Sequence, residues 1–475
     1  MEFTFENVGF IKKGKVKTND ITIIFGPNNV GKTYLSYSIF SILKEYRTYF
    51  LDAGFVNQKM ASTLLSNGFY EEDMSVFIKI PDQIELCNKI SAGLPRFFKD
   101  THNVLKGAKV FVNDSNDYKK FIPVSFVVSI PLTKGLRLVI SKSKSSSNIK
   151  FSLEEIGIND EDLTKQSKKP TIKETLLRMK ILLRYVVATK FFDFIEIEPF
   201  IVTSERTGIS LFLKEIDTNR NNVVNTIALE SYVGMEGANE TIKDIIEDRV
   251  SLFAEPINHN INVIRDSFNA AKNVRIAKED LSEYNSLLNS LAELVGGGYK
   301  VHNEDILFSV KLSDDRYIEM PLSMSSGAGK SLFLLDVFIK NYISKKSYLI
   351  IDEPELNLHP QNQVKMAELL VRLSNFGVKV IITTHSDYIV KEINNRIMAS
   401  SIKSSHVLEE LNYSESDLIN KDRVNAFTIS KDGIISEVDK DEFGLNAKLF
   451  DEAILAVDKR SETLIGEMMR LAEND

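Results

Sequence analysis

The strongest constraint on the fold is a short glycine-rich stretch near the N-terminus, Gly26-Pro-Asn-Asn-Val-Gly31-Lys32-Thr33. It fits the phosphate-binding pattern G-x-x-x-x-G-K-[ST]. The apolar run from Ile21 to Phe25 predicts a buried strand before it, and residues 33–49 carry apolar side chains spaced as on one helix face. The pattern requires a strand, a glycine-rich loop and a helix in this order. The sequence therefore predicts a P-loop nucleotide-binding core.

Each residue type in this loop has a chemical role in binding the nucleotide phosphates or Mg²⁺. Glycines let backbone N–H groups surround the β- and γ-phosphates, and the helix N-terminus adds positive potential. Lys32 neutralises phosphate charge, and the Thr33 hydroxyl is a ligand for Mg²⁺. We therefore expect ATP and Mg²⁺ as cofactors. The expected nucleotide contacts in the loop are Gly26, Pro27, Asn28, Asn29, Val30, Gly31, Lys32 and Thr33.

A second predicted strand ends in two adjacent carboxylates. Residues 347–351 are largely apolar and predict a buried parallel strand, and Asp352, Glu353 and Pro354 follow it. We expect Asp352 in the Mg²⁺ shell with Thr33, and Glu353 beside the water that attacks the γ-phosphate. A solvated turn is the alternative interpretation of such a pair, and the upstream phosphate-binding loop argues against it.

The apolar strand predicted at residues 378–384 ends in His385. A helix predicted at residues 363–374 lies between this strand and the one that ends in Asp352. A right-handed crossover then puts the two strand ends side by side. His385 is thereby placed to reach the γ-phosphate as a catalytic residue together with Glu353. A packed or capping histidine is the alternative.

The sequence Gly329-Lys330-Ser331 imitates the end of a second phosphate-binding loop. The first glycine of that loop would fall at position 324, which is Met324, so a second loop is excluded.

In this order, the segments resemble the ATP-binding-cassette ATPases of the SMC, RecF and OLD type. Met324 to Gly327 looks like their signature sequence, Leu356 to Pro360 like their D-loop, and Thr384 to Ser386 like their switch histidine. The resemblance implies an α/β fold of the ABC ATPase type, a P-loop NTPase with a mixed sheet flanked by helices. It also implies slow, regulatory ATP hydrolysis.

The same resemblance implies a homodimer or higher homo-oligomer that sandwiches ATP in composite sites. Ser325, Ser326 and Gly327 of one protomer would face the nucleotide held by the other. Ala328 departs from the Glu or Gln that relatives often have there.

Two further segments are similar to compact bacterial AAA ATPases of the OLD-like branch. They are residues 200–208, with Glu205, Arg206 and Gly208, and the tail from Val424 onward. Many such proteins are components of anti-phage systems, including PARIS, Septu and some retrons. The resemblance implies an ATPase that acts as a sensor or scaffold and controls a separate effector, a nuclease or Toprim-like protein. Arg206 is open to three readings: a phosphate contact, an interprotomer contact or a structural salt bridge.

Along the chain we expect an ATPase core with a large mixed α+β and helical insertion. Residues 1–49 form its N-terminal part, residues 50–200 the insertion with a partner or trigger surface, and residues 201–234 the return to the core. Residues 235–298 are a helical segment, and residues 299–475 complete the core. Within the insertion, residues 107–151 are rich in strand-like sequence. No sustained heptads are present, so a long coiled coil is not expected.

Charge and cysteine content limit the partners and the compartment. The chain has 59 Lys and Arg against 66 Asp and Glu, so no strong global basic field draws it to nucleic acid. Nucleic acid stays open as a partner, through a local patch such as the lysines of residues 141–147. No stretch reaches the roughly 20 apolar residues of a membrane helix, so no membrane is expected. The single cysteine, Cys87, and the lack of a signal-peptide pattern favour the cytoplasm.

Two alternatives to effector control follow from the same motifs. A RecF-like or SMC-like DNA-binding ATPase in repair or recombination would need a basic groove across the dimer. A transporter subunit is disfavoured, because the insertion and the D-loop form do not look like transport cassettes. OLD nucleases add a Toprim domain of metal-binding carboxylates. Here the pair Asp439 and Asp441 lies in a charged, hairpin-like stretch, so we expect the nuclease to be another chain.

Overall fold

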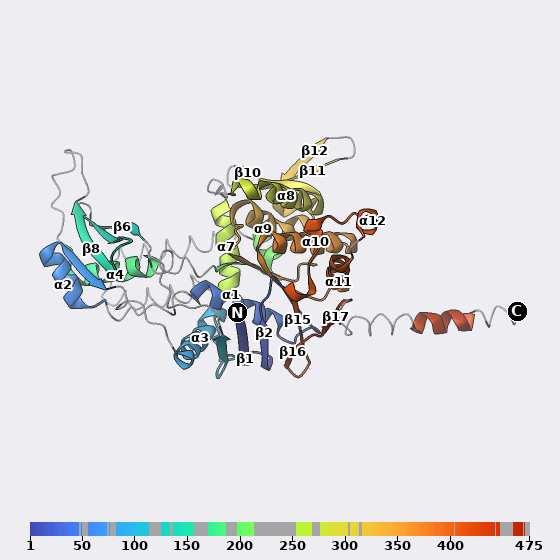
Figure 1. Ribbon diagram of the computed structural model, residues 1–475, viewed down its shortest axis with the longest axis horizontal. Helices are drawn as coiled ribbons and strands as arrows, with labels where there is room; N and C mark the ends of the chain where they lie inside the picture. The colour runs from blue at the N-terminus through green and yellow to red at the C-terminus, as the bar shows by residue number, and fades with distance from the viewer. Residues whose placement is uncertain are drawn as a thin grey trace. The chain divides into compact units, whose positions relative to one another are not determined.

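The structure is a computed structural model of the 475-residue chain. It divides into two compact units, which Figure 1 shows coloured along the sequence. The first unit comprises Met1–Ser41, Gly93–Val110 and Glu198–Asp475, and the second comprises Ile42–Ala92 and Phe111–Ile197. The described residues are 1–46, 49, 56–73, 76, 82–113, 125–133, 136–155, 170–186, 197–212, 253–267, 276–302, 305–312, 316–402, 404–441, 443–446, 459–468 and 470.

The first unit is built on a six-stranded sheet with the order β16-β15-β3-β14-β13-β9. Its strands are β3 (Ile21–Phe25), β9 (Glu198–Val202), β13 (Ser347–Asp352), β14 (Lys379–Thr384), β15 (Val424–Ile429) and β16 (Ile435–Glu437). All neighbours are parallel except β15 and β16. Every residue of β3 and β13 is buried, as continuous apolar runs in a parallel sheet require. The predicted α/β fold class, with a mixed sheet flanked by helices, is confirmed.

Helices flank this sheet (Figure 1). They are α1 (Lys32–Glu45), α7 (Glu255–Ser267), α8 (Leu281–Val295), α9 (Gly327–Asn341), α10 (Pro360–Phe376) and α11 (Asp387–Ser401), followed by α12 (Ser405–Glu410). The apolar faces of α7 to α11 and the sheet share one core of buried side chains. None of the described helices is long and apolar enough to cross a bilayer.

Smaller sheets complete the first unit. The strands β1 (Glu2–Val8), β2 (Ile11–Lys17) and β5 (Lys109–Asn113) have the order β2-β1-β5. A second antiparallel sheet comprises β10 (Gly297–His302), β11 (Asp305–Lys311) and β12 (Tyr317–Pro321). The hairpin of β17 (Lys440–Asp441) and β18 (Gly444–Leu445) contains the charged stretch around Asp441, as its sequence predicts.

The second unit has a four-stranded antiparallel sheet with the order β4-β8-β7-β6. Its strands are β4 (Phe69–Asp73), β6 (Phe126–Thr133), β7 (Leu136–Lys142) and β8 (Asn148–Glu155), and its helices include α2 (Gln58–Asn67) and α4 (Ile172–Val186). Alternate residues such as Leu138, Ile140 and Phe151 are fully buried. The turn between β7 and β8 holds Ser143 to Ser147, so this lysine-containing stretch is a hairpin tip.

The boundaries of the units differ from the expected insertion at residues 50–200. Residues Gly93–Val110, inside that span, belong to the first unit. They contain the end of α3 (Gln83–Phe98) and the first two residues of β5, the strand that extends the β1–β2 sheet. The chain also re-enters the central sheet at β9, which is hydrogen-bonded to β13. Backbone pairing across the sheets therefore sets these boundaries, and residues 213–252 lie outside the described part.

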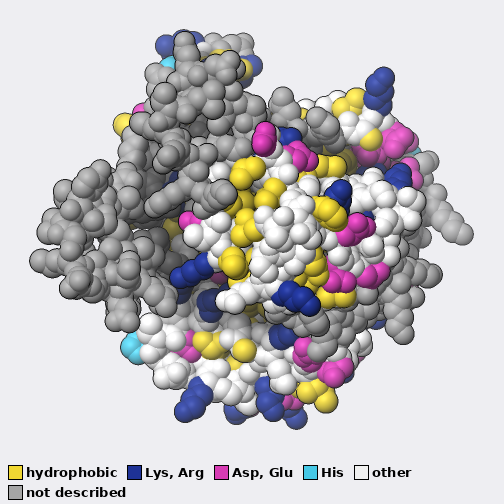
Figure 2. All heavy atoms as spheres, turned by 90° about the vertical axis from the view of Figure 1, so that its left-hand side faces the viewer, with side chains coloured by type: hydrophobic (Ala, Val, Ile, Leu, Met, Phe, Trp, Pro, Cys, Tyr) yellow, Lys and Arg dark blue, Asp and Glu magenta, His cyan; other side chains and the backbone are white. Residues whose placement is uncertain are grey.

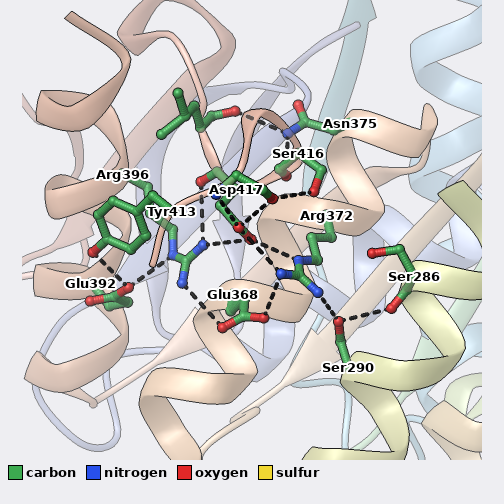
Figure 3. A network of polar contacts seen from close by, with 12 residues as sticks. Ser286, Ser290, Glu368, Arg372, Asn375, Glu392, Arg396, Tyr413, Ser416 and Asp417 are labelled. Carbon is green, nitrogen blue, oxygen red and sulfur yellow. Dashed lines mark hydrogen bonds and ion pairs between the residues drawn. The ribbon is translucent and has the colours of Figure 1, made fainter. Parts of the chain in front are cut away.

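An ionic network around the buried Asp417 joins α10, α11 and the 3₁₀ turn η8 (Glu415–Asp417), as Figure 3 shows. Arg372 Nε donates to Asp417 Oδ1 at 2.7 Å, and Arg396 Nη1 lies 3.1 Å from the same oxygen. Burial alone would raise the pKa of Asp417, but hydrogen bonds from Arg372 and Ser414 outweigh it and lower the pKa to about 2. Asp417 is 1% exposed, and it compensates the two arginines together with Glu368 and Glu392.

We expect Asp417→Asn to destabilise the first unit by about 1–3 kcal/mol at pH 7, because the buried Arg396 and the partly buried Arg372 lose one of the carboxylates that compensate them. The folded pKa lies below the unfolded value of about 3.9, so the carboxylate stabilises the fold above that pH. This contribution is lost as the pH falls toward 2. Urea denaturation followed by circular dichroism at pH 7 and at pH 3 tests this. Equal urea midpoints for the wild-type and Asp417→Asn proteins at pH 7 would contradict the expected loss of stability.

Candidate active site

The loop between β3 and α1 has the backbone that its glycines predict. Gly26 and Gly31 have φ of 153° and 101°, and Asn29 has φ of 63°. A Cβ atom on Gly26 would lie 2.8 Å from the carbonyl oxygen of Ile429, so glycine is required there. Lys32 Nζ donates to the carbonyls of Gly26 at 3.1 Å and Pro27 at 2.8 Å. The ammonium group is therefore held across the loop.

Thr33 and Asp352 meet at the base of this loop. Thr33 Oγ1 donates to Asp352 Oδ2 at 2.9 Å, and the Thr383 hydroxyl donates to Asp352 Oδ1. Asp352 is 1% exposed, and burial raises its pKa against these hydrogen bonds. A carboxylate and a hydroxyl are the hard oxygen ligands that Mg²⁺ prefers. The described residues contain no group of three or more His, Cys, Asp or Glu side chains that could hold a metal ion.

Glu353 and His385 lie beside each other at two adjacent strand ends. Asp352 pairs with Thr383 in the parallel β13–β14 ladder, so the predicted juxtaposition is confirmed. His385 Nε2 is 3.6 Å from Glu353 Oε1, and each side chain is about one third exposed. Burial and then the positive charge of Lys32 lower the pKa of His385. The imidazole is therefore neutral at pH 7, with one N–H donor and one acceptor.

These residues line one pocket of about 370 Å³. Its described lining residues are Phe10, Asn28, Asn29, Gly31, Lys32, Thr33, Tyr34, Glu353 and His385. The structure thus brings the phosphate-binding loop, Glu353 and His385 together in one pocket. Gly26, Pro27, Val30 and Asp352 support the pocket from the loop and the strand without lining it.

Two aromatic residues of the pocket are absent from the sequence-based prediction. Phe10 is 63% exposed in the turn between β1 and β2, and its ring meets Tyr34 edge-on at 6.0 Å. Tyr34 in turn stacks on Phe98 at 5.1 Å. An exposed phenylalanine in a tight turn is a weak sequence signal, because only the folded β1–β2 sheet brings it to the loop.

The signature-like residues do not line this pocket. The Ser325 hydroxyl is buried and donates to the carbonyl of Leu322 at 2.8 Å. Ser326 caps α9 by accepting from the Gly329 N–H at 3.1 Å, and it is exposed together with Gly327. Their contact with a nucleotide of a second protomer stays a prediction. An exposed helix N-terminus is suited to an anion.

Arg206 lies outside the pocket as well. It is 2% exposed, and among the described residues its guanidinium group donates to four main-chain carbonyls and forms no salt bridge. A contact with phosphate or with a second protomer stays a prediction.

A family model described as the AAA ATPase domain matches residues 1–390. The chain belongs to this AAA ATPase domain family. The matched span contains Lys32, Asp352, Glu353 and His385, so the pocket lies within the AAA ATPase domain.

Curated relatives match shorter parts of this AAA ATPase domain protein. It is 33% identical to the Old nuclease of Escherichia phage P2 over 145 residues, which cover 28% of this chain and 22% of the nuclease. It is 34% identical to a putative ABC transporter ATP-binding protein of Methanosarcina acetivorans over 76 residues, 16% of this chain and 26% of that protein. The chain thus spans about a quarter of the length of these relatives.

Solved structures similar to the AAA ATPase domain protein include two SMC head domains. The head from Pyrococcus furiosus, bound to the C-terminal domain of ScpA, has a TM-score of 0.31 at 12% identity, covering 97% of this chain and 98% of that one. The head from Thermotoga maritima has a TM-score of 0.30 at 13% identity, covering 93% and 98%.

Proposed function

We propose that the chain is a Mg²⁺-dependent ATPase that hydrolyses ATP slowly and uses the reaction for regulation. The observation that carries the proposal is the convergence of Lys32, Glu353 and His385 on one pocket, with His385 Nε2 3.6 Å from Glu353 Oε1. Bound Mg²⁺ would neutralise charge on the β- and γ-phosphates, and Thr33 and Asp352 would hold it.

The protein groups would bind the phosphates, activate the attacking water and stabilise the developing negative charge. Lys32 and the loop N–H groups bind the phosphates, and Glu353 orients and deprotonates the attacking water. The neutral His385 donates its N–H to the γ-phosphate, where negative charge develops. The carboxylate of Glu353 is one third exposed, so water can reach it.

We further propose that two chains complete the site. The signature-like Gly327 packs against Asn357 of the D-loop, since a Cβ atom on Gly327 would lie 3.1 Å from Asn357 Cγ. Both motifs therefore lie together at the exposed start of α9. A second protomer could present this surface to the ATP held by the first, with Ser325, Ser326 and Gly327 toward the phosphates.

The proposed role is control of a separate effector, a nuclease or Toprim-like protein, in cytoplasmic anti-phage defence. Similarity to the Old nuclease supports a link to nuclease systems. The second unit, which has its own sheet and core, would offer the surface for a partner or trigger. Closure of the dimer around ATP would change the surface that it offers to the effector, because only the closed state completes the two composite ATP sites.

Affinity purification of Glu353→Gln protein from its native cells, with ATP present, tests this role. A stoichiometric nuclease-like protein in the eluate is the expected result, and infection of cells lacking either chain would follow. DNA without a protein partner would contradict effector control.

A RecF-like or SMC-like DNA-binding ATPase is the second candidate. The face drawn in Figure 2 has Lys and Arg side chains interspersed with Asp and Glu around exposed hydrophobic groups, without a continuous basic stripe. Lys142, the last residue of β7, is buried and donates to the carbonyl of Ser143. This candidate requires DNA affinity that falls steeply with salt.

We also propose that Phe10 stacks on the adenine base, since it is exposed at the edge of the pocket. Replacing Phe10 by alanine is expected to weaken ATP binding about tenfold, because base stacking contributes about 1–3 kcal/mol. Titration should show unchanged binding of inorganic tripolyphosphate, which has no base. Phe443→Ala is the matched control, since Phe443 is similarly exposed at 66% but does not line the pocket. Equal loss of ATP and tripolyphosphate would refute stacking.

A further inference from the structure

We propose that Arg206 is a positioning residue that holds Glu353 in its working conformation and couples it to α9. This inference rests on the proposed hydrolysis by Glu353. It assigns Arg206 neither to the nucleotide nor to a second protomer.

The guanidinium group of Arg206 donates to four carbonyl oxygens. Nε reaches Ser331 at 3.0 Å, and Nη1 reaches Thr203 at 2.9 Å and Asp352 at 2.8 Å. Nη2 reaches Glu353 at 2.7 Å. The group is planar and its five N–H donors have fixed directions, so these bonds fix the carbonyls relative to one another. A lysine could keep the charge but could not reproduce this pattern.

Glu353 needs such support because its backbone is strained. Its φ of 55° lies in the left-handed region, which costs a non-glycine residue about 1–2 kcal/mol. The following Pro354 further disfavours helical values at Glu353. The Glu353 N–H donates to the Thr383 carbonyl at 3.0 Å, and Arg206 holds the Glu353 carbonyl. Hydrogen bonds therefore hold both the N–H and the carbonyl group of Glu353. This backbone conformation directs the Glu353 side chain toward His385.

The charge on Arg206 suits this role. An arginine guanidinium is not deprotonated in proteins, so all of its donors remain in use. It lies behind the acidic strand end, away from the described lining of the pocket.

Arg206 also connects Glu353 to the signature-like helix. Ser331, whose carbonyl it binds, lies in α9, which begins at Gly327. The preceding residue, Glu205, accepts from the Tyr37 hydroxyl of α1 at 2.5 Å. The Glu205–Arg206 pair, which follows β9 by a few residues, thus joins α1, β13 and α9. A movement of α9 would be transmitted to the Glu353 carbonyl through a single side chain.

The test is Arg206→Lys, measured in the wild-type and the Glu353→Gln backgrounds. We expect kcat to fall at least tenfold in the wild-type background, with the Kd for ATP changed less than threefold. In the Glu353→Gln background the same substitution should change the residual rate less than twofold, because the group it positions is already absent. Arg396→Lys is the control: Arg396 is also 2% exposed, but it binds Glu392 and Asp417. It should lower the melting temperature and leave kcat unchanged.

Three results would overturn the inference. The first is an unchanged kcat in Arg206→Lys, and the second is an equal loss in both backgrounds. The third is failure of both Arg206→Lys and Arg206→Gln to fold while Arg396→Lys folds, which would assign Arg206 to stability alone. Absence of turnover in the wild-type protein would instead refute the proposed function.

Discussion

Glu353→Gln is expected to lower ATP turnover by about 10²- to 10⁴-fold, the usual contribution of a general base. The amide keeps the shape of the side chain but cannot accept the proton of the attacking water. ATP binding should persist, because Lys32, Thr33 and the loop N–H groups are unchanged. ATP should then accumulate in the closed assembly. Phosphate release, ATP binding and light scattering with ATP measure these three effects.

Glu319→Gln is a suitable control for that substitution. Glu319 lies on β12 and pairs with the exposed Lys300 at 3.0 Å, outside the described pocket lining. Its turnover should match the wild-type rate. Full turnover in Glu353→Gln would show that another group activates the water.

Lys32→Ala is expected to weaken ATP binding by about 10²-fold or more, since it removes charge-assisted hydrogen bonds that contribute about 1.5–3 kcal/mol each. Lys32 is the one lysine or arginine among the described lining residues, and His385 is neutral at pH 7. Burial lowers the pKa of Lys32, while Glu353, Asp352 and Glu355 raise it. Calorimetric titration with ATP and Mg²⁺ measures the affinity.

Lys330→Ala is the matched comparison for this experiment. Lys330 also lies in a Gly-Lys-Ser sequence, but its ammonium group donates to the Ser325 carbonyl of its own chain at 2.7 Å. At concentrations where the protein is monomeric, ATP affinity should stay at the wild-type value. Equal losses in both variants would mean that the loop after β3 is not the primary phosphate site.

The sequence predicts the parts of this site that depend on local pattern. Buried strands are recognisable as apolar runs, and the loop glycines are recognisable by their spacing. The contact between Glu353 and His385 follows from one crossover rule, because each residue comes directly after a strand.

Other parts depend on contacts that no local pattern encodes. Gly93–Val110 returns to the first unit through pairing of β5 with β1, without a shift in composition. Phe10 reaches the loop only because β1 and β2 fold over it. The acceptors of Arg206 are main-chain carbonyls, which every residue has, so the sequence alone leaves its role open.

The most direct test of the account is phosphate release from ATP by the purified wild-type chain, with Mg²⁺ and with excess EDTA. We predict slow turnover that requires Mg²⁺, with a rate per chain that rises with protein concentration as two chains complete each site. No release at any concentration, or release that EDTA and Lys32→Ala leave unchanged, would contradict an ATPase at this pocket.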